Sequence, residues 1–159
     1  MLISPLRTQR ELASLITPHR TQGPHTALLI LPQGQLLSSA TAYNDYPEEN
    51  GEEDANGGTD ESGDEPCLDD PERMRLLLGL ASQWEEDESP RVECELGRLL
   101  LCPIPLPPTE IPAPNAAIPV IRSPTAQTFV LVLNGSSQTP WNVMTAKADE
   151  FKSKWDARI

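Results

Sequence analysis

The sequence predicts a mixed α/β fold (α+β), a three-layer α/β/α sandwich around a five-stranded antiparallel sheet with the order α-β-β-α-β-β-β-α. Two apolar segments, 26–31 and 129–133, lack a polar face and are typical of central strands covered on both sides. A third segment, 91–96, alternates between apolar and charged residues, as an edge strand does. Helical patterns near both ends of the chain and at 70–85 supply the outer layers.

The first half of the chain contains a predicted helix and a predicted hairpin. The helix spans 4–17, because Ser4 and Pro5 form an N-cap and an N1 proline before apolar residues at helical spacing. The apolar run 26–31 is followed by a proline–glutamine–glycine turn and by 35–41. These two segments therefore form a predicted β-hairpin.

The second half supplies the remaining elements. A helix is predicted over 70–85, where an aspartate caps the start and a proline occupies the first turn. Strand 91–96 turns at a glycine into strand 98–104, and 127–133 is a further apolar strand. A final helix is predicted over 140–158.

Two irregular segments interrupt a single predicted domain that spans 1–159. The first, 44–70, holds 12 acidic residues and no Lys or Arg in 27 positions, whereas acids and bases balance in the rest of the chain. Its charge and scarcity of apolar residues predict a disordered insertion. The second, 103–124, contains eight of the 17 prolines and predicts an extended, locally stiff loop.

Composition excludes several classes of function. A formal charge of −12 argues against non-specific binding to nucleic acid or to anionic membranes. No apolar run approaches the roughly 20 residues that span a bilayer. The N-terminal residues do not resemble a signal peptide, and Leu2 stands where N-myristoylation needs a glycine. We therefore expect a cytosolic protein without an anchor of its own.

The two longer predicted helices differ in the width of their apolar faces. In the last helix the apolar residues fall within an arc of about 80°, which suits packing on one sheet face. In 70–85 they spread over about 200°, which predicts that a second chain covers the excess, although a broad core contact is the simpler alternative. The predicted partner-binding residues are Met74, Leu76, Leu77, Leu78, Leu80, Ala81, Trp84, Val92, Cys94 and Leu96.

The strand residues belong to this set because an edge strand presents unpaired backbone groups on its outer side. Glu93 and Glu95 have a second interpretation, as charges that protect the edge from pairing. The helix and the strand together indicate helix-to-helix and sheet-to-sheet pairing of two similar domains.

No catalytic, cofactor-binding or metal-binding residues are predicted. Cys67, Cys94 and Cys102 lack zinc-site spacing and are expected to be reduced thiols, and His19 and His25 are expected in a loop. An acidic run that begins at residue 54 fails the calcium-loop pattern, because threonine occupies the position that needs glycine. Nucleotide-binding and hydrolase motifs are also missing, so we expect a non-enzyme without a cofactor.

Several segments resemble the roadblock superfamily, named for the roadblock-type dynein light chains. The resemblance lies in Thr26-Ala-Leu-Leu-Ile-Leu-Pro-Gln-Gly-Gln-Leu-Leu37, the leucine-rich helix at 73–84, Gly97-Arg98-Leu-Leu-Leu-Cys102, and the last strand and helix. It covers about 112 residues, an ordinary size for one small domain. The Met-Leu start and Met144-Thr-Ala-Lys-Ala-Asp-Glu-Phe151 resemble the roadblock subunits of Ragulator, the EGO complex of fungi.

This resemblance implies a non-catalytic scaffold. Roadblock domains pair through the central helix and the adjacent edge strand, which correspond to 71–85 and 91–96 here. Ragulator-type subunits form heterodimers with another roadblock protein and dock Rag GTPases in signalling to the TOR kinase. They sit on the cytosolic face of the late endosome, lysosome or vacuole, where a separate lipidated subunit holds them.

Three alternatives stay open. The chain could be a dynein roadblock light chain, which shares the fold, or a longin-type trafficking subunit, although longin domains generally begin with a strand. A regulator of a small GTPase's nucleotide cycle is a third class. No arginine-finger candidate stands out among the predicted loops, in which Arg20 and Arg122 are the arginines.

Overall fold

The computed structural model describes residues 4–17, 22–42, 70–85, 89–106 and 127–157. The elements in chain order are α1 (Pro5–Leu15), β1 (Thr26–Ile30), β2 (Leu36–Thr41), α2 (Asp70–Ala81), β3 (Arg91–Cys94), β4 (Gly97–Pro105), β5 (Thr128–Gly135) and α3 (Trp141–Asp156). The predicted mixed fold, with three helices and a five-stranded antiparallel sheet, is confirmed.

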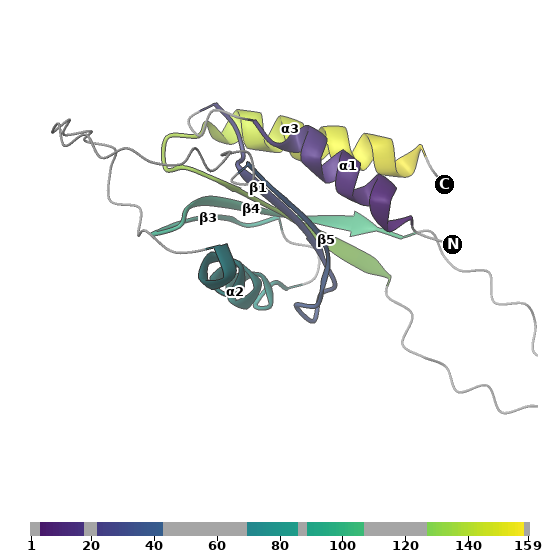
Figure 1. Cartoon of the computed structure of the whole chain (residues 1–159), viewed down its shortest axis with the longest axis horizontal. Helices are drawn as coiled ribbons and strands as arrows, with labels where there is room; N and C mark the ends of the chain where they lie inside the picture. The colour runs from purple at the N-terminus through teal and green to yellow at the C-terminus, as the bar shows by residue number, and fades with distance from the viewer. Residues whose placement is uncertain (1–3, 18–21, 43–69, 86–88, 107–126, 158–159) are drawn as a thin grey trace, which may run out of the picture.

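The strands lie in the order β2-β1-β5-β4-β3, so β2 and β3 are the edges. Helices α1 and α3 cover one face of the sheet, and α2 covers the other (Figure 1). The two apolar segments expected at the centre are β1 and β5, and the alternating segment is at the edge. This arrangement buries every residue of β1 and nearly all of β5.

Alternate residues of the central strands enter two separate cores. On one face, Leu29 and Leu131 pack with the α1 and α3 residues, among them Phe151 and Trp155. On the other face, Leu28 and Val132 pack with the buried side of α2. The period of two in a strand thus joins three layers through one sheet.

Helix α1 is shorter than predicted but begins at the expected place. Ser4 occupies the N-cap position and Pro5 the first turn, yet the Ser4 side chain makes no capping hydrogen bond. The Ser4 carbonyl instead accepts hydrogen bonds from the backbone N–H and the hydroxyl of Thr8. Leu12 and Leu15 are buried, which anchors the helix on the sheet.

Helix α2 ends at Ala81, four residues before the predicted end. The N–H of Gln83 bonds to the carbonyl of Leu80 at 3.2 Å, and that of Trp84 bonds to Ala81 at 3.1 Å. These bonds span three residues rather than four, so the backbone tightens into a turn. This turn directs the chain from α2 towards β3.

Strand β4 extends through two prolines of the predicted irregular segment 103–124, the first of which also lay in the predicted strand 98–104. Pro103 lies opposite Val130 of β5, and Pro105 lies opposite Thr128. The N–H of Leu101 bonds to the carbonyl of Pro90, so odd-numbered residues of β4 direct their N–H positions away from β5. Because β3 starts only at Arg91, opposite Leu100, it does not reach as far as Pro103 and Pro105. The N–H groups that these prolines lack are therefore not needed for pairing with β3.

A buried amide fixes the tight turn between β3 and β4. Asn134 of β5 donates from Nδ2 to the carbonyls of Leu96 at 2.8 Å and Arg98 at 3.2 Å. Gly97, between them, has a φ of 93°, and a Cβ there would clash with the carbonyl of Gly135. The turn therefore requires glycine and holds β3 against the sheet.

The acidic insertion and most of the proline-rich loop lie outside the described residues. Among the helices of the described part, none has the length and apolar character needed to cross a membrane.

We expect Leu77→Ala to lower the free energy of unfolding by about 2–5 kcal/mol, since the side chain is fully buried between α2 and the sheet. Leu76→Ala, one residue earlier on the exposed side, should cost less than about 1 kcal/mol. Urea denaturation of both variants measures the difference, and similar losses would contradict this placement of the helix.

Candidate interaction surface

The exposed side of α2 carries two large leucines. Leu77 and Ala81 face the sheet and are fully buried, whereas Leu76 is 49% exposed and Leu80 is 38% exposed. Leu76 and Leu80 are one helical turn apart and therefore lie side by side. We call this pair the α2 flank.

The α2 flank faces the side of the sheet where β3 lies. Leu80, together with Trp84, borders the same groove as Val92 of β3. On the opposite side of α2, the turn before β2 lies close to the helix: a Cβ added at Gly34 would lie 3.0 Å from the Cβ of Ser82. Because Leu76 lies one helical turn before Leu80, the exposed leucines and the β3 edge are on one side of the domain.

The backbone of β3 offers hydrogen-bonding groups at this edge. Pro90 directs its carbonyl towards β4, where it accepts from Leu101 at 3.2 Å. Since the direction alternates along a strand, Arg91 and Glu93 direct their N–H and C=O groups outwards. We call these four groups the β3 edge.

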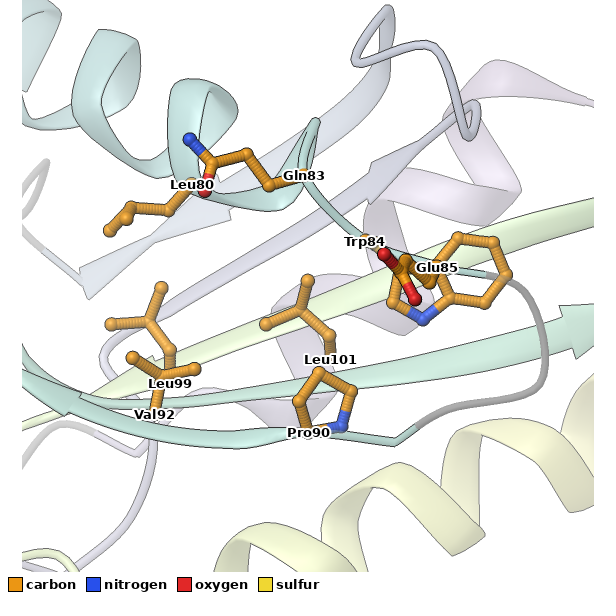
Figure 2. A pocket seen from close by; sticks show the side chains of 8 residues that line it. All are labelled: Leu80, Gln83, Trp84, Glu85, Pro90, Val92, Leu99 and Leu101. Carbon is orange, nitrogen blue, oxygen red and sulfur yellow. The ribbon is translucent and has the colours of Figure 1, made fainter.

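A groove of about 440 Å³ lies between the α2 flank and the sheet (Figure 2). Leu80 and Gln83 border it from the helix side, and Trp84 closes one end (Figure 2). Its lining residues are Leu80, Gln83, Trp84, Glu85, Pro90, Val92, Leu99 and Leu101. The groove is mainly apolar and can receive a bulky apolar side chain.

The side chains of Arg91 and Glu93 lie on the opposite face of β3, beside α3. The guanidinium groups of Arg91 and Arg98 lie 5.9 and 5.2 Å from the ring centroid of Trp141. Arg98 also donates to the carbonyl of Thr139 at 2.8 Å and lies 3.7 Å from the Glu93 carboxylate. These contacts attach the short edge strand to the start of α3.

The structure divides the predicted partner-binding residues between surface and core. Leu76, Leu80, Trp84 and Val92 border the α2 flank, the groove and the edge. Met74, Leu78 and Cys94 are half-buried and pack against the α2-side core. Leu77, Ala81 and Leu96 belong to the core itself, so we correct their assignment to a partner surface.

The correction has a local physical reason. Leu77 and Ala81 are four residues apart on the side of α2 that faces β1, β4 and β5. Leu96 was assigned to the edge strand, but β3 ends at Cys94 and Leu96 lies in the tight turn, 4% exposed. A broad apolar arc does not show which residues face the protein's own sheet.

Sequence reasoning missed most of the groove. Gln83 and Glu85 follow the end of α2, and Leu99 and Leu101 come from the neighbouring strand β4. One signal was present: in the predicted strand next to the edge, Leu99 and Leu101 share one face and alternate with residues of the other face. Because the sequence does not show the register of β4, this alternation did not place the two leucines under α2.

The cysteines and the described histidine occupy structural positions. Cys94 is half-buried on the α2 side, while Cys102 is buried on the other face. His25 lies in the loop directly before β1, as predicted, and is fully buried there, with Nδ1 2.9 Å from the Thr26 hydroxyl. Cys67, His19, Arg20 and Arg122 lie outside the described residues.

Within the described ranges, His, Cys, Asp and Glu form no group of three that could hold a metal ion. Compared with known proteins, the chain matches no family model and no curated protein.

Alkylation should distinguish the two strand cysteines. Burial raises the pKa of the Cys102 thiol, which lowers its thiolate fraction at neutral pH, and the side chain is only 7% exposed. We expect iodoacetamide to modify Cys94 first and Cys102 only after unfolding, as measured by peptide mass spectrometry. Equal rates in the native protein would contradict the assigned burial.

Proposed function

We propose that this chain is a non-catalytic scaffold subunit that forms a heterodimer with another roadblock-type chain. The α2 flank contacts the partner's helix, and the β3 edge pairs with the partner's edge strand, so that the two sheets become continuous. One observation carries the proposal: two exposed leucines and outward backbone groups lie on the same side of the domain.

The energetics of this surface suit pairing. Complete burial of a leucine side chain contributes about 1.5–3 kcal/mol, and Leu76 and Leu80 keep a large part of that area in water. A strand added at Arg91 and Glu93 would pair backbone groups that face outwards in the single chain. The groove between them adds a pocket for a side chain of the partner.

The cellular role follows from the resemblance of the Met-Leu start and of 144–151 to Ragulator-type roadblock subunits. In this proposal the heterodimer docks Rag GTPases and serves nutrient signalling to the TOR kinase. It is held at the cytosolic face of the lysosome or vacuole by a separate lipidated subunit. The chain itself supplies surfaces rather than chemistry.

The test compares three forms of the tagged full-length chain, purified with their partners from native cells. The wild type should recover another roadblock protein and Rag-type GTPases. Leu76→Glu combined with Leu80→Glu should lose the roadblock partner, because two charges would be buried at the interface. The matched control is Leu6→Glu, since Leu6 is a 73% exposed leucine on α1, which covers the other sheet face.

Recovery of dynein intermediate chains in place of Rag-type GTPases would move the protein to motor transport and overturn the signalling role. A roadblock partner retained by the double variant at wild-type level would overturn the proposed surface.

A proline at the edge provides a second test. We expect Glu93→Pro to leave the thermal unfolding midpoint within a few degrees of wild type, because the N–H of Glu93 points away from β4. The same change should abolish recovery of the roadblock partner, since it removes a donor from the β3 edge. Glu93→Ala keeps the N–H and is the control, and equal loss with both variants would show that the side chain is what matters.

A further inference from the structure

Five places in the chain have serine or threonine directly before proline, which is the pair of residues that proline-directed protein kinases recognise. They are Ser4-Pro5, Thr17-Pro18, Ser89-Pro90, Ser123-Pro124 and Thr139-Pro140. The substrate hydroxyl must reach the γ-phosphate of ATP in line inside the kinase. It therefore needs to be exposed, on a backbone that can lie extended, and the fold decides which of the five places meets both conditions.

Exposure and backbone conformation set three of these places aside. Thr139 is fully buried, and Thr17 is half-buried. Ser4 is exposed, but Pro5 is already the first residue of α1, so the pair is not extended. Ser123 lies outside the described residues.

Ser89 meets both conditions. Its side chain is exposed, and the proline after it favours an extended backbone at Ser89 itself. The chain then continues directly into β3 at Arg91. Because β3 is an edge, its outer side has no neighbouring strand among the described residues, and a kinase can bind this stretch from that side.

The residues around Ser89 indicate the class of kinase. Positions 85–88 are Glu-Glu-Asp-Glu, so a kinase that recognises arginine or lysine before the hydroxyl would meet acids instead. A kinase that recognises an acid three residues after the hydroxyl would meet Val92. Pro90 suits the proline-directed class.

The Ser89 side chain lies on the α3 side of the sheet. Continuing the pairing of β3 with β4 by two residues places Ser89 opposite Cys102, which is buried on that side. Burial raises the pKa of the Cys102 thiol, and a hydrogen bond from the Ser89 side chain opposes this rise, so the two side chains are in contact. Arg91 is two residues further along and lies on the same side, with its guanidinium 5.9 Å from the Trp141 ring centroid.

From this placement we infer that Ser89 is a phosphorylation site for a proline-directed kinase and that Arg91 binds the added phosphate. The Ser89 hydroxyl oxygen attacks the γ-phosphorus of ATP, its proton passes to the catalytic base of the kinase, and ADP leaves. The chain gains about two negative charges and three acceptor oxygens at the start of β3. This modification is separate from the proposed function and needs no partner chain.

The surroundings of this hydroxyl can hold a phosphate. A guanidinium has five N–H donors, and Arg91 donates to the Thr145 hydroxyl at 3.4 Å, so other donors can reach the phosphate. Besides burial, Lys152 lowers and Asp149 raises the pKa of the Cys102 thiol, so a cation and an anion of α3 lie nearby and offset each other. Arg91 is therefore the cation that we expect to decide the state of the phosphate.

The first experiment incubates the folded full-length chain with Mg²⁺, ATP and a recombinant mitogen-activated protein kinase, and locates phosphate by tandem mass spectrometry. Trypsin releases the peptide 76–91, which contains Ser89 and also Ser82, an exposed serine followed by glutamine. Ser89 should be modified in most molecules, whereas Ser82 and the buried Thr139 should not. Pro90→Ala should slow the modification of Ser89 by about tenfold or more, because it removes the residue that the kinase recognises.

The second experiment tests the role of Arg91 by ³¹P NMR titration of the phosphorylated chain. A guanidinium beside the phosphate favours its dianion, so Arg91→Gln should raise the second pKa of the phosphate by about 0.2–0.7. Arg7→Gln is the matched control, since Arg7 is an exposed arginine of α1 and should leave this pKa unchanged.

Ser89 left unmodified, while the same kinase modifies a standard substrate, would overturn the site. Equal modification of Ser89 and Thr139 would also overturn it, because exposure would then not select the residue. An unchanged phosphate pKa in Arg91→Gln would overturn the role of Arg91. All three results are obtained on the chain alone, so they are independent of whether the chain pairs with a roadblock partner.

Discussion

Burial of β5 on both faces is the constraint from which the rest of the structure follows. The strand pairs with β1 on one side and β4 on the other, and its residues from Phe129 to Asn134 are buried. A strand of this kind needs a helix layer above and below it, which α3 and α2 provide. Because β1 and β4 occupy its two sides, β2 and β3 become the edges. The edge position of β3, and with it the candidate surface, therefore follows from the burial of the central strand β5.

Local patterns predicted the layers because they depend on periodicity within single segments. The stripe of Met144, Ala148, Phe151 and Trp155 is buried as the spacing of α3 indicated. The α2 side chains were harder to assign, since six apolar residues spread around the helix and only the position of the sheet decides which of them face it. Leu76 and Leu77 are neighbours in the sequence and the same residue type, yet one is half exposed and the other fully buried.

The groove and the length of β4 depend on register, which a single sequence does not display. Leu99 and Leu101 reach the groove only because β4 lies beneath α2. Pro103 and Pro105 indicated an irregular segment by composition, whereas proline disrupts a strand only where its missing N–H would be needed. Here the deciding feature is the direction of the N–H position at Pro103 and Pro105, which follows from the hydrogen bond between Leu101 and Pro90.

Those two prolines also bear on how the sheet behaves when molecules are crowded together. An exposed strand with a full row of donors and acceptors is a template on which unrelated extended chains can accumulate, as in fibril growth. The outer side of β4 beyond Leu101 presents carbonyl oxygens but lacks a donor at every position where one would be aimed outwards up to Pro105. An incoming strand could bind alongside β3 but would find no continuous ladder past its end. At the β3 side of the sheet, the backbone available to an incoming strand is thus limited to a length of about four residues.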